Sequence, residues 1–96
     1  EALMTKYERL ESYLKIIERI LPERKHQKIT FLLLQVSLFA SEGMTLPDIV
    51  ETTGVGYTTV KSFLNSKTGK SLCPVSMDGR RKLYQLDMDQ LDKNLE

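Results

Sequence analysis

A run of polar residues near the middle of the chain has side chains suited to binding nucleic acid. The run consists of Gly56, Tyr57, Thr58, Thr59, Lys61 and Ser62. Hydroxyl groups and a cation bind phosphate oxygens and the edges of bases. A glycine directly before a helix leaves the first backbone N–H groups open to a phosphate. If these residues lie on the exposed side of a helix, they form a surface that can enter a groove of DNA.

The surrounding stretch, residues 45–65, has the pattern of two short helices joined by a tight turn. Gly54 stands where such a turn needs a positive φ, which costs other residues about 1 kcal/mol or more. Thr45 fits the N-cap of the first helix, and Pro47 fits its first turn. The positions that would pack the helices together are apolar, namely Ile49, Val50, Val55, Val60 and Phe63. The spacing predicts a helix-turn-helix with helices over 46–53 and 57–66, although an αα corner that binds nothing has the same pattern.

Positive charge is concentrated downstream of the second of these helices. The whole chain has a net charge of only +1, which excludes a uniformly basic protein. Residues 61–82 nevertheless hold six Lys or Arg side chains against Asp78 alone, whereas residues 87–96 hold four acids against Lys93. Besides Lys61, the cations are Lys67, Lys70, Arg80, Arg81 and Lys82. This local excess favours a phosphate-bearing partner, and the alternative is a solvated basic loop.

The chain has few of the residues that enzymes and metal sites need, with one cysteine and one histidine. The single Cys73 excludes an internal disulfide and an all-cysteine zinc site, and the single His26 has no partner at metal-ligand spacing. Gly69-Lys70-Ser71 matches the end of a phosphate loop, but Leu64 stands where that motif needs its first glycine. No acid, base or nucleophile pair is evident. We therefore expect a non-enzyme that binds no metal and no cofactor.

Composition sets the class of protein. With 96 residues, of which 41% are hydrophobic and 28% charged, the chain is too apolar to be disordered and too short for two cores. We expect a single domain over residues 1–96. A signal peptide and an apolar run approaching about 20 residues are both absent from the sequence. The expected location is the cytoplasm, in association with the nucleoid, with no membrane contact.

The first 22 residues predict a long amphipathic helix that is a candidate dimerisation element. Apolar residues alternate at spacings of four and three, as in a coiled-coil seam, up to the break at Pro22. The seam consists of Leu3, Tyr7, Leu10, Leu14, Ile17 and Leu21. Tyr13, Ile16 and Ile20 widen the stripe on one side. Part of this stripe is expected to face a second copy of the chain, and the alternative is that all of it packs within the monomer.

The remaining segments complete a helical domain with one hairpin. Residues 26–41 are apolar on nearly every side and predict a buried helix, capped by Gly43. We expect a strand of one or two residues at Met44. Residues 71–77 and 80–86 predict two strands around an Asp78-Gly79 turn, with Pro74 restricting the first strand to an edge or a bulge. A short helix over 87–96 closes the chain. The expected fold class is mainly α with a small β-hairpin (α+β).

Two segments of the chain resemble the winged helix-turn-helix, and specifically the MarR family of transcriptional regulators. Residues 45–60 are similar to the helix-turn-helix of that family. The segment from Asp78 to Leu86, with Arg80 and Arg81, looks like its wing. The resemblance covers about residues 29–87 and implies that helix 57–66 enters the major groove while a wing arginine reaches the minor groove. That family dimerises through two C-terminal helices that have no counterpart here, so dimerisation would fall to the N-terminal helix.

These patterns together predict a winged-helix core over residues 26–86 that binds double-stranded DNA sequence-specifically. We expect a small transcriptional regulator, a homodimer, with helix 57–66 in the major groove and wing 78–82 on the adjacent backbone or minor groove. The first alternative is a winged-helix module that docks on another protein. The second is a plasmid or phage replication or partition protein that binds DNA in the same way.

Overall fold

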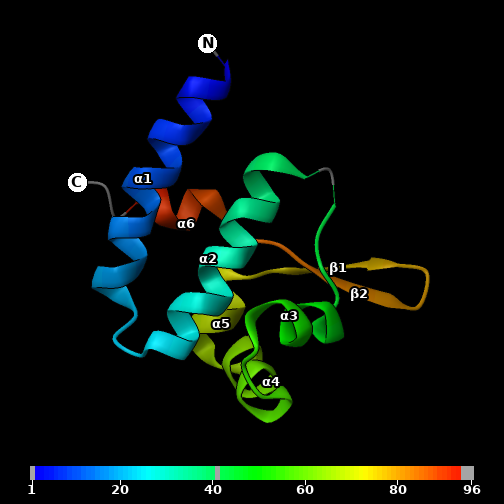
Figure 1. Cartoon of the computed structure of the whole chain (residues 1–96). Coiled ribbons are helices and arrows are strands. Elements are labelled where there is room, and N and C mark those ends of the chain that lie inside the picture. Colours follow the sequence, from blue (N-terminus) through cyan, green and yellow to red (C-terminus); the bar gives the residue numbers. More distant parts are fainter. Residues whose placement is uncertain (1, 41, 94–96) are drawn as a thin grey trace.

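The computed structural model describes the backbone of residues 2–40 and 42–93 and the side chains from Tyr7 onward within those ranges. In this part of the chain, six helices enclose the core and one antiparallel hairpin projects from them (Figure 1). The helices are α1 (Ala2–Ile20), α2 (Arg24–Phe39), α3 (Leu46–Thr53), α4 (Tyr57–Asn65), α5 (Lys67–Leu72) and α6 (Met88–Asp92). The strands are β1 (Val75–Asp78) and β2 (Arg81–Tyr84). The expectation of a mainly helical chain with a small β-hairpin is confirmed.

Helix α2 is the buried spine that its composition predicted. Ile29, Leu33 and Leu34 are completely buried in the core. Thr30 is also buried, and its hydroxyl donates a hydrogen bond to the His26 carbonyl (2.8 Å), so burial leaves this polar group satisfied. Helices α1, α3 and α4 pack against this spine, which therefore holds α3 and α4 in position (Figure 1).

Gly43 does not cap α2, contrary to the sequence-based expectation. The helix ends at Phe39, and the extended Ala40 closes its last turn by donating to the Val36 carbonyl (2.9 Å). A Cβ at position 43 would overlap the Tyr84 carbonyl oxygen, so glycine is needed there for close approach to β2. Met44 then exchanges two backbone hydrogen bonds with Tyr84 (3.0 and 2.7 Å). The expected strand at Met44 is thus an isolated bridge.

Residues 67–72 form helix α5, so the predicted start of the first strand at residues 71 and 72 is wrong. Ser66 starts this helix, because its hydroxyl accepts a hydrogen bond from the Gly69 N–H (3.0 Å). The same hydroxyl donates to the Phe63 carbonyl (2.6 Å) at the end of α4. One serine therefore ends α4 and begins α5. The strand starts only after Pro74, which fixes its own φ and has no N–H for the ladder.

The hairpin turn lies one residue later than predicted. Asp78 pairs with Arg81, so the two turn residues are Gly79 and Arg80 rather than Asp78 and Gly79. Gly79 has a φ of 64°, while Arg80 has none of the positive φ that marks the left-handed region. A glycine with positive φ at the first turn position is the signature of a type II′ turn, whose twist matches that of two antiparallel strands. Arg80 consequently occupies the tip of the hairpin.

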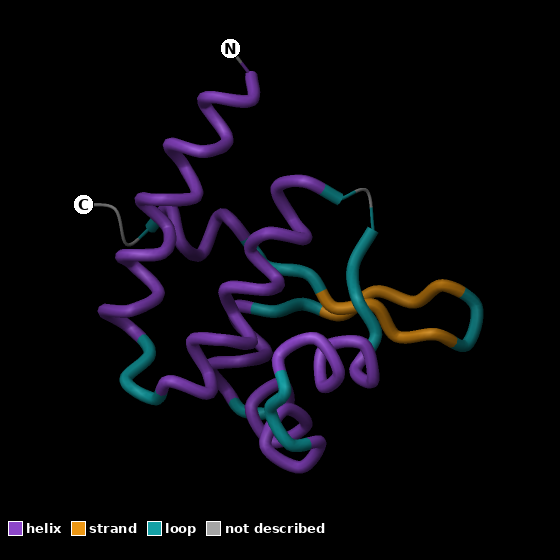
Figure 2. Tube along the Cα trace, in the orientation of Figure 1, coloured by secondary structure: helices purple, strands orange, loops and turns teal. Residues whose placement is uncertain are grey.

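The base of the hairpin is fixed to the helices on both sides. The Ser37 hydroxyl of α2 accepts a hydrogen bond from the Leu86 N–H (2.9 Å), and the Asp87 N–H donates to the Leu72 carbonyl (2.7 Å). Helix α6 follows, with Leu91 fully buried. Figure 2 shows the two strands extending beyond this base, away from the helices. The hairpin is therefore anchored at one end and free at the other.

Much of the apolar stripe of α1 packs against the core of the same chain. Ile17 and Leu21 are buried, so these two of the predicted dimerisation residues offer no surface to a second copy. Leu10 and Leu14 are partly buried against the same core. Tyr7 is 55% exposed and packs on Phe39 of α2, with 5.5 Å between ring centroids. The side chain of Leu3 lies outside the described part of the structure.

Cys73 gives a pH-dependent test of this packing. The thiol is buried, and burial raises its pKa to about 12 from an ordinary value of 9.0. Below pH 9 the thiol is protonated in both states, and the free energy of unfolding does not depend on its ionisation. Between pH 9 and 12 only the unfolded thiol ionises, so the folded state loses stability relative to the unfolded state as the pH rises. We expect the free energy of unfolding to fall by up to about 1.4 kcal/mol per pH unit more in the wild type than in Cys73→Ala. Urea denaturation at about pH 8 and pH 10 measures this difference, and parallel pH profiles would contradict the burial of Cys73.

Candidate nucleic-acid interface

The turn between α3 and α4 is held in one geometry by short-range hydrogen bonds. Gly54 ends α3 in the left-handed conformation (φ 74°), and its N–H donates to the Val50 carbonyl (2.9 Å). The Thr53 hydroxyl donates to the Ile49 carbonyl (2.7 Å) and accepts from the Val55 N–H (3.2 Å). These bonds satisfy the end of α3 and set the direction in which α4 leaves the turn. The predicted glycine and turn are confirmed.

Helix α4 presents a polar face to solvent. Its opposite face is buried through Val60, Phe63 and Leu64. Of the residues predicted to face a partner, Thr59 is half-buried, whereas the others are exposed: Gly56, Tyr57, Thr58, Lys61 and Ser62. Gly56 is the N-cap in extended conformation, and no side-chain hydrogen bond caps the first N–H groups of α4. The exposed face therefore combines hydroxyls, one cation and a helix N-terminus.

A hollow of about 480 Å³ lies where α4, β2 and the start of α3 meet, and we call it the cationic hollow. Lys61 of α4 lines it together with Arg81 and Lys82 of β2. None of its described lining residues is Asp or Glu. The full lining is Thr45, Leu46, Pro47, Tyr57, Lys61, Asn65, Arg81, Lys82 and Tyr84. The fold thus brings the two regions predicted from the sequence, the polar helix and the basic hairpin, to one concave site.

The charged groups of the cationic hollow are held weakly. Lys61 Nζ lies 6.0 Å from the centroid of the Tyr57 ring, at the outer limit of a cation–π contact. Arg81 Nη1 lies 3.7 Å from a carboxylate oxygen of Asp78, and both side chains are 59% exposed. An exposed ion pair of this kind contributes at most about 1 kcal/mol. Arg81 can therefore leave Asp78 for a phosphate at little cost.

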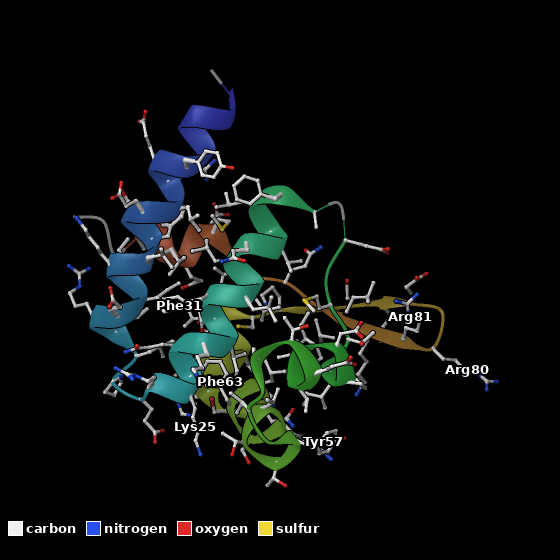
Figure 3. The ribbon with its side chains drawn as sticks, in the orientation of Figure 1. Lys25, Phe31, Tyr57, Phe63, Arg80 and Arg81 are labelled. Carbon is white, nitrogen blue, oxygen red and sulfur yellow. The ribbon has the colours of Figure 1, made fainter. Side chains whose placement is uncertain are left out.

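The other predicted cations occupy three different places. Arg80 lies at the hairpin tip and points away from the helices, outside the cationic hollow (Figure 3). Lys70 lines a second hollow of about 260 Å³, which shares Asn65, Lys82 and Tyr84 with the first. Lys67 instead lies beside Ile20 of α1 and Gln90 of α6. Lys67 therefore does not join the cations around α4 and β2.

Asn65 is a member of the site that the sequence analysis missed. It follows Tyr57 and Lys61 at intervals of four residues, which places all three on one side of α4. Asparagine is also a residue type that can form two hydrogen bonds with adenine. The spacing along the helix was therefore a signal in the sequence, and the structure shows Asn65 as the last residue of α4.

A second basic group stands at the start of α2. Arg24, Lys25 and Lys28 are exposed there, while His26 stacks on Phe63 of α4 with 4.5 Å between ring centroids. In the view of Figure 3, Lys25 and the hairpin arginines lie on opposite sides of α4. This group has the same charge type as the cationic hollow but lies outside its lining.

The described part of the chain holds neither a metal-ligand cluster nor a membrane-spanning helix. Within residues 2–40 and 42–93, no cluster of three or more His, Cys, Asp or Glu side chains is arranged to hold a metal ion, and none of the helices has the length and apolar character to span a bilayer. Comparisons of the chain with protein-family models, with curated proteins and with solved structures found no match.

Proposed function

We propose that this protein binds double-stranded DNA, with α4 in the major groove and the hairpin on the adjacent backbone or minor groove. One observation carries the proposal: the polar face of α4 and the cations of β2 converge on a single hollow whose described lining contains no carboxylate. The net charge of the whole chain is only +1, so this convergence is a property of one face. The proposal treats α3, α4 and the hairpin as a winged helix-turn-helix.

The proposal gives α4 and the hairpin different tasks. Tyr57, Thr58 and Ser62 present groups that can reach base edges or a thymine methyl, and Asn65 adds an amide. Lys61, Arg81 and Lys82 neutralise phosphates and hold the duplex in register. Arg80, at the hairpin tip, is directed toward the flanking backbone or minor groove (Figure 3). The proposal requires no catalytic step, metal or cofactor.

The hairpin is tested by removing its two arginines. The double variant Arg80→Ala/Arg81→Ala should bind duplex DNA more weakly and flatten the slope of log K against log salt by about 1 to 2 units, because each lost phosphate contact removes about 0.9 unit. Fluorescence anisotropy over a salt series measures the slope. Arg24→Ala/Lys25→Ala removes the same charge elsewhere and should leave it nearly unchanged. An unaltered slope in the hairpin variant would show that the hairpin does not touch DNA.

We further propose that the protein is a small transcriptional regulator that acts as a homodimer in the cytoplasm, on the nucleoid. In such a dimer, Tyr7 is the exposed aromatic residue of α1 available to a second copy, together with the outer edges of Leu10 and Leu14. Two copies would place their α4 helices about 34 Å apart and select an inverted repeat. Selection from a random duplex pool tests this arrangement, and recovery of a single half-site would instead indicate a bound monomer. A replication or partition protein would share the same DNA contacts.

A second candidate function is docking on another protein. The observation that favours it is the exposed aromatic pair Tyr7 and Phe39, which are 55% and 43% exposed and in contact. Under this alternative the chain forms a stable complex with a protein partner and has no affinity for DNA at physiological salt. The same anisotropy measurement separates the two candidates.

A further inference from the structure

The cationic hollow has aromatic walls in addition to its charges. Tyr57 of α4 and Tyr84 of β2 both line it, and the Tyr57 side chain is 51% exposed. Leu46 and Pro47 add apolar surface at the start of α3. Phosphate contacts on the outside of a duplex need cations but not aromatic rings, because paired bases are stacked on each other and do not expose their faces. The tyrosines are therefore not explained by backbone contacts alone.

Aromatic rings beside cations are the arrangement that holds an unpaired nucleotide. A base that is free of its stack can lie on a tyrosine ring, while lysine and arginine neutralise the phosphates on either side. A hollow of about 480 Å³ is also within the usual volume of sites that enclose small organic ligands. The site therefore has both the surface chemistry and the space for one nucleotide.

The neighbouring hollow extends this site along α4. It shares Asn65, Lys82 and Tyr84 with the cationic hollow and adds Lys70 from α5. None of the described residues that line the second hollow is Asp or Glu. The two hollows together provide four cations along a continuous path, which suits a strand whose phosphates continue past the first nucleotide.

We propose that the cationic hollow binds a nucleotide whose base is unpaired, with the base on Tyr57 and its phosphates on Lys61, Arg81 and Lys82. This inference rests on the proposed function where the nucleotide belongs to a DNA strand at the end of a duplex or in a gap. A free nucleotide offers the same chemistry, and the two sources are distinguished by experiment. The consequence for DNA is a preference for a duplex with an unpaired tail over a blunt one.

The test compares blunt duplex, the same duplex with a single-stranded tail, and a nucleoside monophosphate, each titrated at constant salt. We expect the tailed duplex to bind about tenfold more tightly than the blunt duplex. Tyr57→Ala should remove this difference, so that the variant binds tailed and blunt duplex equally, and Tyr57→Phe should retain the difference because it keeps the ring. Tyr7→Ala removes a similarly exposed tyrosine of α1 and should keep the preference for the tailed over the blunt duplex.

Each outcome decides a separate question. Equal affinities for tailed and blunt duplex, with both binding, would overturn this inference and leave the proposed function intact. Failure of both duplexes to bind would overturn the proposed function. In that case saturable binding of the nucleoside monophosphate that is lost in Tyr57→Ala would support the hollow as a site for a free nucleotide, and no such binding would overturn the inference as well.

Discussion

The triple variant Lys61→Ala/Arg81→Ala/Lys82→Ala is expected to lose DNA affinity by a factor of about 100 or more at 0.1 M salt. The three cations line one hollow, so a strand in that hollow is within reach of all of them. Three lost phosphate contacts should also flatten the slope of log K against log salt by about 2.7 units. Because all three side chains are exposed, their removal should change the free energy of unfolding by only about 0.5 kcal/mol each or less.

The basic group at the start of α2 provides a control for this experiment. Arg24→Ala/Lys25→Ala/Lys28→Ala removes the same net charge from the exposed start of α2. If only the overall charge mattered, the two triple variants would lose affinity equally. We expect the control to lose less than about tenfold at the same salt concentration. Equal losses in both variants would refute the assignment of the cationic hollow as the phosphate-binding site.

The substitution Gly69→Ala is expected to destabilise the folded chain by about 3 kcal/mol or more. Helix propensity alone predicts the opposite sign, because alanine is favoured over glycine in a helix by about 1 kcal/mol. Gly69 is buried where α5 meets α4, and an added Cβ would overlap the Phe63 carbonyl oxygen and lie 3.1 Å from the Leu64 Cα. These are backbone atoms, so no rotamer change relieves the overlap and the two helices must separate.

Gly56→Ala is the matched control for Gly69→Ala. A Cβ at position 56 meets nothing within 4 Å, and the residue has no positive φ. Urea denaturation should show a much lower midpoint for Gly69→Ala and a change of about 1 kcal/mol or less for Gly56→Ala, which exchanges one uncharged N-cap residue for another. A Gly69→Ala variant as stable as the wild type would contradict the close packing of α5 on α4.

The helices of the site could be predicted because their signals act over short distances. Gly54 marks a turn that needs a positive φ, and Thr45 caps α3 by accepting from the Asp48 N–H (3.4 Å) within the first turn. The apolar positions Ile49, Val60 and Phe63 are buried as their spacing indicated. Each of these features depends on residues no more than about one helical turn apart, which is the range over which a pattern in the sequence is informative.

Helix α5 and the hairpin turn could not be predicted with the same rules. Ser66 both ends α4 and begins α5, and the polar residues around it resemble a loop. The turn position depends on the pairing of Asp78 with Arg81, and a pattern of alternating residues does not distinguish registers that differ by one residue on exposed strands. In both places the deciding contacts join residues only three positions apart, but the residue pattern fits more than one local structure.

The sequence predicts only in part which cations line the cationic hollow. Lys61 and Arg81 were both identified as basic residues, but their convergence depends on how the hairpin is anchored to α2 through Ser37 and Leu86. Lys67 belongs to the same basic segment of the sequence but lies on α5, beside Ile20 and Gln90. A segment of like charges predicts the class of partner, whereas the packing of the helices determines which charges share a surface.

The most direct test of DNA binding is anisotropy of a fluorescent random-sequence duplex titrated with the purified protein at about 50 and 200 mM salt. We predict saturable binding at the lower salt concentration that weakens by about 10² to 10³ at the higher one, as expected for four to five phosphate contacts from the cations around α4 and the hairpin. Absence of binding at about 50 mM salt would contradict the proposed function, since phosphate contacts are strongest there.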